Sequence, residues 1–149
     1  MALNFNQYAN EGNAFLNEYA KKINMPDDTD KAGRILSSVL HGLREIIPVE
    51  ESLQLISQFP MFLKAVYVNR WTLGEKEKVK NMTEFIDLIR ELNGVTGMYD
   101  FGSEEIAENY IKTTFMVLRK YISLGELEDI RTVLPKELKS IVYQNMMFQ

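Results

Sequence analysis

The sequence predicts an all-α protein of about eight helices, formed by two tandemly repeated four-helix units. Apolar residues recur at steps of three and four along most of the chain, which is the pattern of amphipathic helices. No useful length of the chain alternates apolar and polar residues, as a half-buried strand would. A phrase with an apolar residue, proline, two further residues, leucine and lysine occurs twice, as FPMFLK (59–64) and LPKELK (134–139).

This phrase belongs to a longer internal repeat. When the chain is aligned with itself at a shift of 75 positions, the distance from Pro60 to Pro135, residues 43–66 match residues 118–141 without a gap. Similarity between two unrelated amphipathic helices would explain the shared leucines. It would not explain proline, arginine and lysine in register, so the sequence predicts a tandem duplication. The identical polar and proline pairs are Arg44/Arg119, Glu51/Glu126, Pro60/Pro135 and Lys64/Lys139.

The duplication predicts how the chain is divided. We expect one helical unit over residues 1–72 and a second over residues 81–149. The segment between them, 73–80, contains the alternating charges of GEKEKVK and is interpreted as a solvated linker. Because 149 residues is the length of one ordinary domain, we expect the two units to pack as one compact body.

The first unit is predicted to contain four helices. An apolar stripe from Phe5 to Ile23 indicates the first, and Gly12 within it indicates that another helix crosses closely there. The second begins after PDDTDKAG, where Asp28 or Thr29 can cap it, and extends to Ile47. Proline is suited to the first turn of a helix, because its missing N–H group has no partner there. Pro48 and Pro60 therefore predict a third helix over 49–59 and a fourth over 61–71.

The second unit repeats this order. Its predicted helices cover 82–93, 103–122, 124–133 and 135–147. Ser123 takes the place of Pro48 and is a suitable N-cap residue.

Several segments together are similar to a known family. They are Leu43-Arg44, Pro48-Val49-Glu50-Glu51, Phe59-Pro60 and the stretch from Tyr67 to Trp71. The chain resembles, from about Phe15 to Tyr143, the bacterial domain-of-unknown-function family 2267 (DUF2267). It departs from that pattern in having phenylalanine before Pro60, and in having Asn69-Arg70 where the resemblance implies a glycine. The resemblance implies an all-helical fold and a bacterial origin. It implies no activity and no catalytic residues.

Composition and charge exclude several classes of function. The net charge of −4 and the pI near 5.1 argue against nucleic-acid binding, which needs a concentrated basic face. The absence of cysteine excludes disulfides and thiolate metal sites. No apolar run approaches the roughly 18–20 residues that span a bilayer, and the first residues lack an export signal. We therefore expect a cytoplasmic protein with no membrane contact.

Candidate catalytic and metal-binding residues have simpler interpretations. The single histidine, His41, lies off the apolar stripe and is predicted to be exposed near Glu45, not to act as a general base. The acidic residues of 27–30 lack the spacing of a calcium loop and are interpreted as helix-capping residues. The acids that begin the short helices, including Glu51 and Glu126, receive the same interpretation. We therefore predict no catalytic residue, no metal ligand and no cofactor.

The polar residues retained in both copies suggest structural contacts. The sequence predicts that Glu51 pairs with Arg44, and Glu126 with Arg119, each within its own unit.

Differences between the copies suggest a binding surface. Leu53, Ile56 and Phe62 are apolar, whereas the matched Glu128, Arg131 and Glu137 are charged. Either the units pack face to unlike face, or the first unit offers an apolar patch to another molecule. The leading hypothesis is a non-enzymatic interaction module that binds a protein partner or a second copy of itself. The alternative is a small-molecule binding protein, or an unrecognised enzyme, with a pocket between the repeats. The speculative partner-binding residues are Leu53, Ile56, Phe62, Tyr67 and Trp71.

Overall fold

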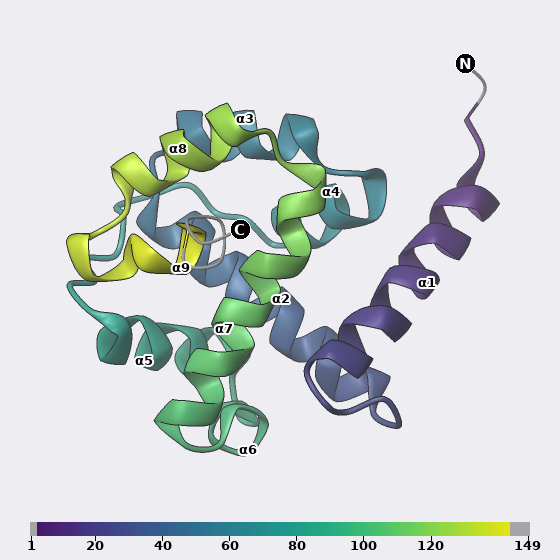
Figure 1. Ribbon diagram of the computed structural model, residues 1–149, viewed down its shortest axis with the longest axis horizontal. Helices are drawn as coiled ribbons and strands as arrows, with labels where there is room; N and C mark the ends of the chain where they lie inside the picture. The colour runs from purple at the N-terminus through teal and green to yellow at the C-terminus, as the bar shows by residue number, and fades with distance from the viewer. Residues whose placement is uncertain (1–2, 144–149) are drawn as a thin grey trace.

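The computed structural model describes residues 3–143, and these residues are helical with no strand (Figure 1). The prediction of an all-α protein is confirmed. In the described part, the α-helices and the short 3₁₀ helices η1 and η2 follow one another as α1 (Phe5–Lys22), α2 (Thr29–Ile46), α3 (Val49–Gln58), α4 (Met61–Val68), α5 (Met82–Asn93), α6 (Gly97–Phe101), α7 (Glu104–Leu118), η1 (Arg119–Tyr121), α8 (Leu124–Val133), η2 (Lys136–Leu138) and α9 (Ser140–Tyr143).

The structure differs from the predicted helices in four places, the first of which is the division of the helix predicted over 103–122 into α7 and η1. Helix α6 was not predicted, because its five residues are too few to show an apolar period. Helix α4 ends at Val68 and not at residue 71, since Asn69 leaves the helical conformation and Arg70 has a φ of +58°. The predicted helix over 135–147 is divided into η2 and α9, and its residues 144–147 lie outside the described part of the chain.

Local capping explains where most helices begin. The predicted cap Asp28 accepts a hydrogen bond from the backbone N–H of Lys31 (3.1 Å), and Ser123 accepts one from Glu126 N–H (3.1 Å). Pro48, Pro60 and Pro135 each occupy the position just before a helix, with φ between −54° and −65°. The prolines therefore mark the predicted corners, one position earlier than the first helical residue.

Helix α2 lies at the centre of the molecule and packs against α1, α4, α5, α6 and α7 (Figure 1). Its close crossing with α5 depends on Gly42, where a Cβ atom would lie only 2.8 Å from Ile89 Cγ1. Gly12 serves a similar crossing of α1 and α4, since a Cβ atom there would lie 3.0 Å from the Cβ of Phe62. The expectation of a close crossing at Gly12 is confirmed.

A buried arginine holds the end of α4. Arg44, on α2, is 6% exposed and donates hydrogen bonds to the backbone carbonyls of three residues that end α4 or follow it. Its Nη1 lies 2.6 Å from the oxygen of Tyr67, and a further bond of 3.2 Å joins Nη2 to the oxygen of Arg70. The predicted pairing of Arg44 with Glu51 is wrong, because the carbonyls at this helix end take the guanidinium instead.

Candidate functional site

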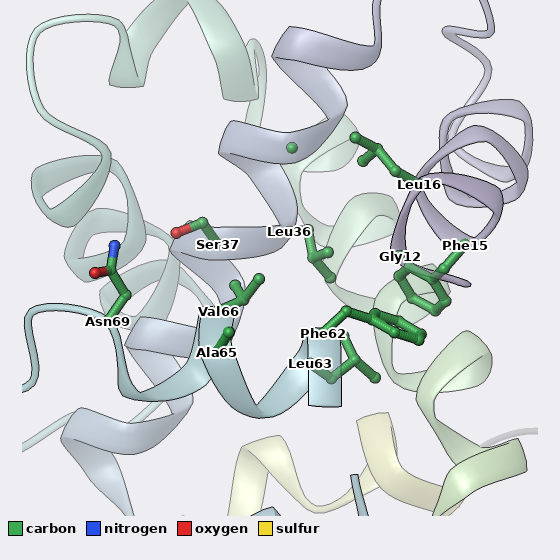
Figure 2. Close-up of a pocket in the computed structure, with 11 residues that line it drawn as sticks. Gly12, Phe15, Leu16, Leu36, Ser37, Phe62, Leu63, Ala65, Val66 and Asn69 are labelled. Atoms are coloured by element: carbon green, nitrogen blue, oxygen red, sulfur yellow. The ribbon is translucent and has the colours of Figure 1, made fainter. Parts of the chain in front are cut away.

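An apolar hollow of about 470 Å³ lies between α1, α2 and α4 (Figure 2). Its aromatic wall is made by Phe15 of α1 and Phe62 of α4, whose ring centroids are 5.2 Å apart. Figure 2 shows these two rings at one end and Ser37 and Asn69 toward the other. The remaining lining residues are Gly12, Leu16, Gly33, Leu36, Leu63, Ala65 and Val66.

The hollow is formed within the first predicted unit. Every lining residue lies between positions 12 and 69, whereas the sequence-based alternative placed a pocket between the two units. Gly33 leaves space on the α2 wall: a Cβ atom added there would meet only Leu16 Cδ1, at 3.9 Å. A small residue at this position therefore keeps the hollow open.

A polar hollow of about 540 Å³ adjoins the apolar one. The two share Gly33, Ser37 and Asn69 in their walls. The further residues that line the polar hollow are Asp30, Arg34, Ser38, His41, Arg44, Arg70, Leu92 and Asn93. The shared residues make the two hollows neighbouring parts of one groove, which we call the α1/α2/α4 groove.

One arginine in the polar hollow is neutralised by a buried acid. The carboxylate of Asp100 is completely buried and accepts hydrogen bonds from Arg34 Nε (2.8 Å) and Nη2 (3.0 Å). It also accepts bonds from Asn93 (3.0 Å) and Thr96 (2.9 Å). The Arg34 guanidinium, more than the two neutral donors, holds the pKa of Asp100 below its usual value. This pair therefore fixes α2 to α6 and adds little net charge to the groove.

Arg70 adds a positive charge to the wall of the polar hollow. Its side chain is exposed, and within residues 3–143 it takes part in no ion pair. Its φ of +58° lies in the left-handed region, which costs a residue with a Cβ atom about 1–2 kcal/mol. The same φ accounts for the glycine that the family resemblance implies in this segment. In this chain, the strained position carries a cation at the rim of the polar hollow.

His41 lies in the wall of the polar hollow and is half-buried, so the prediction of an exposed side chain is wrong. Its Nε2 lies 2.8 Å from the carbonyl oxygen of Val66, and Nε2–H is therefore the donor. Burial lowers the pKa of His41, and the nearby Arg44 lowers it further. The neutral imidazole joins α2 to α4, which is a structural contact that sequence spacing did not indicate.

The five predicted partner-binding residues do not share one exposed surface. Leu53 on α3 is 57% exposed, but Tyr67 on α4 is completely buried, and one hydrogen bond of 2.6 Å joins its hydroxyl to that of Ser52. Trp71 is half-buried with its ring edge-on to Tyr67, at 5.7 Å between centroids. Ile56 and Phe62 are half-buried against the core. The prediction that Tyr67 offers a contact surface is wrong, because Ser52 satisfies its hydroxyl inside the core.

Three acidic residues lie close together where α3 packs against α8. One carboxylate oxygen from each of Glu51, Glu126 and Asp129 can be chosen so that all three lie within 4.8 Å of one another. Burial raises the pKa of Glu126 to about 8, and the contact with Glu51 adds to this effect. The predicted pairing of each glutamate with its own arginine is therefore wrong for Glu51 and Glu126, which lie against each other. One sequence feature could have indicated this contact, since the two glutamates are 75 positions apart and are paired in the predicted repeat.

Among residues 3–143, no helix is both long enough and apolar enough to cross a membrane.

Comparisons with known proteins identify the family of the chain. No curated protein matches the sequence significantly. The model of a family described as "Uncharacterized conserved protein (DUF2267)" matches residues 12–141, and this chain therefore belongs to the DUF2267 family.

Proposed function

We propose that this protein is a non-enzymatic binding protein whose α1/α2/α4 groove takes a small molecule with an apolar body and an anionic head. The observation that carries the proposal is the adjacency of the apolar hollow to the polar one, through the shared Gly33, Ser37 and Asn69. Such a groove offers two chemically different halves to one ligand.

The apolar hollow suits the body of the ligand. Its volume of about 470 Å³ falls in the range of small-molecule sites, which is roughly 300–1,000 Å³. Phe15 and Phe62 provide an aromatic wall for a flat or branched apolar group. Its few polar residues, Ser37 and Asn69, stand where the hollow meets its polar neighbour, so a ligand would have one preferred direction.

The polar hollow suits an anionic head. Arg34 is already paired with Asp100, and Arg44 is engaged by backbone carbonyls. Among the described residues that line the hollow, Arg70 is the cation that remains for an external carboxylate, sulfonate or phosphate, and Asn69 beside it can donate a hydrogen bond. Asp30 also lines the hollow, and it disfavours a head that carries more than a small negative charge.

The tandem duplication remains part of the proposal for how the chain arose. It is supported by the bounds of α3 and α8, which differ by 75 positions at both ends. It is also supported by the starts of α2 and α7, Thr29 and Glu104, which are 75 positions apart.

The protein-interaction module is a second candidate function. The observation that favours it is the exposure of Leu53 on α3, at 57%, because a leucine of this kind can bury its surface against a second copy of the chain. Binding of small probes in the groove by a monomeric protein, measured together with light scattering, would favour the first candidate over this one.

Filling the groove should abolish binding of apolar probes. In the Gly33→Leu variant, the new side chain would occupy the space that separates α1 from α2, since only Leu16 lies near a Cβ atom there. We expect the affinity for 1-anilinonaphthalene-8-sulfonate, an anionic apolar dye, to fall at least about tenfold, or ~1.4 kcal/mol. Fluorescence titration measures the effect, and near-ultraviolet circular dichroism verifies that the core remains packed.

The matched control is Gly33→Ala. Alanine adds one methyl group, which leaves most of the hollow open, and it favours the helix by up to about 1 kcal/mol over glycine. We expect this variant to bind the dye as the unchanged protein does and to melt at a somewhat higher temperature. Equal dye binding by the leucine variant would contradict the proposal.

Removing the charge of Arg70 should weaken the binding of an anionic probe and leave the binding of an uncharged probe unchanged. Asparagine tolerates the left-handed conformation, so Arg70→Asn should not lower stability. We expect about fivefold weaker binding of the anionic dye, or ~1 kcal/mol, the scale of a partly exposed charge pair. Binding of N-phenyl-1-naphthylamine, its uncharged analogue, should not change. An equal loss for both dyes would show that Arg70 acts through the shape of the groove and not through its charge.

A further inference from the structure

The acids between α3 and α8 form a compact arrangement of oxygen ligands. Glu126 and Asp129 lie one helical turn apart on α8, and Glu51 projects from α3. The three carboxylates can present one oxygen each within 4.8 Å of one another. Three charges of one sign at this separation repel each other strongly unless something neutralises them.

Each glutamate of this cluster has one buried carboxylate oxygen without a hydrogen bond. Glu126 is only 5% exposed, and its Oε2 is buried without a hydrogen bond. Oε2 of Glu51 is buried in the same way. In the part of the chain that the structure describes, no lysine or arginine forms an ion pair with Glu51, Glu126 or Asp129. Buried carboxylates of this kind need either a proton or a cation.

Helix capping does not explain the position of Glu126. It stands three residues after the cap Ser123, where a glutamate ordinarily accepts a hydrogen bond from the cap's backbone N–H. Here that N–H is donated to Oε1 of Gln58, at 2.7 Å. Gln58 comes from the end of α3, so it takes over the capping role. The carboxylate of Glu126 is thereby free to lie against Glu51.

We propose that Glu51, Glu126 and Asp129 bind a divalent cation that joins α3 to α8. An all-carboxylate set is typical of hard cations, so the class is Ca²⁺, Mg²⁺ or Mn²⁺ and not zinc or copper. Asp129 is exposed, which leaves one side of the ion open to water. The site is separate from the α1/α2/α4 groove, because it shares none of the groove's lining residues. Its expected role is to hold α3 and α8, the matching helices of the two predicted units, against each other.

Titration of the full-length protein with each cation tests the proposal. We expect CaCl₂, MgCl₂ or MnCl₂ to raise the melting temperature and to give a one-to-one isotherm in calorimetry. The Glu126→Gln variant should weaken this binding at least about tenfold. Its amide keeps the size of the side chain, so the fold should survive. Asp129→Asn is a second variant, at an exposed position where it does not disturb the core. It should also weaken cation binding.

Glu50→Gln is the matched control. Glu50 is an exposed acid in the first turn of α3, next to Glu51 but outside the cluster. It should leave cation binding unchanged. The proposal is overturned if none of the three cations gives heat or a melting shift, in which case a shared proton neutralises the acids. It is also overturned if Glu50→Gln weakens binding as much as Glu126→Gln does, because the cations would then be attracted by general surface charge.

Discussion

Replacing Arg44 by alanine should lower the free energy of unfolding by about 3–5 kcal/mol, a large part of the roughly 5–15 kcal/mol that stabilises an ordinary domain. Arg44 is 6% exposed, and its guanidinium donates three hydrogen bonds to carbonyls at the end of α4. Alanine would leave those carbonyls without partners and would create a cavity beside Tyr67. Urea denaturation followed by circular dichroism measures the change.

The control for this prediction is Arg119→Ala. Arg119 is the residue that the predicted repeat pairs with Arg44, but it is half-buried, and within residues 3–143 it holds no comparable set of carbonyls. We expect its loss to cost about 1 kcal/mol or less. Similar costs for the two variants would mean that the hydrogen bonds at the end of α4 contribute little beyond the burial of an arginine stem.

Replacing Asp100 by alanine should cost about 3–5 kcal/mol of stability, because it removes a completely buried carboxylate that accepts from Arg34, Asn93 and Thr96. The three donors would then face a cavity. Arg34 is 41% exposed, so water can rehydrate it and the cost should lie toward the lower end of that range. A double-mutant cycle with Arg34→Ala separates the contribution of the ion pair from that of the two neutral donors.

The same carboxylate should make stability depend on pH in acid. The pKa of Asp100 is lower in the folded protein than in the unfolded chain, where an aspartate titrates near about 3.9. Its contribution is therefore fully present above that value and is lost as the pH falls through the lower, folded pKa. The difference in stability between the unchanged protein and Asp100→Asn should shrink as the pH is lowered from about 5 toward 2. A constant difference would contradict this assignment.

Helix positions could be predicted from the sequence because their signals are local. Asp28 and Ser123 cap the residues three positions after them, and a proline fixes its own φ whatever surrounds it. Helix α6 was not predicted, because its signal is not local. It is short, and it is held by the buried contact of Asp100 with Arg34, 66 residues away, which no local pattern reveals.

The candidate sites could not be predicted, because they depend on contacts between distant segments. Glu51 was expected to meet Arg44 across one corner, but the packing of α3 on α8 brings it to Glu126 instead. Tyr67 was predicted to contact a partner, but its hydroxyl forms a hydrogen bond with that of Ser52 inside the core. The groove depends on the space that Gly33 leaves beside Leu16. The sequence alone does not show which glycine borders such a space.

The position of α2 has a consequence for how the chain holds together. Gly42 brings α2 against Phe85 and Ile89 of α5, so the boundary between the two predicted units runs through the hydrophobic interior. Removal of either predicted unit would expose apolar residues of the other, because each supplies part of the other's apolar surroundings. A core substitution in one predicted unit should therefore lower the stability of both.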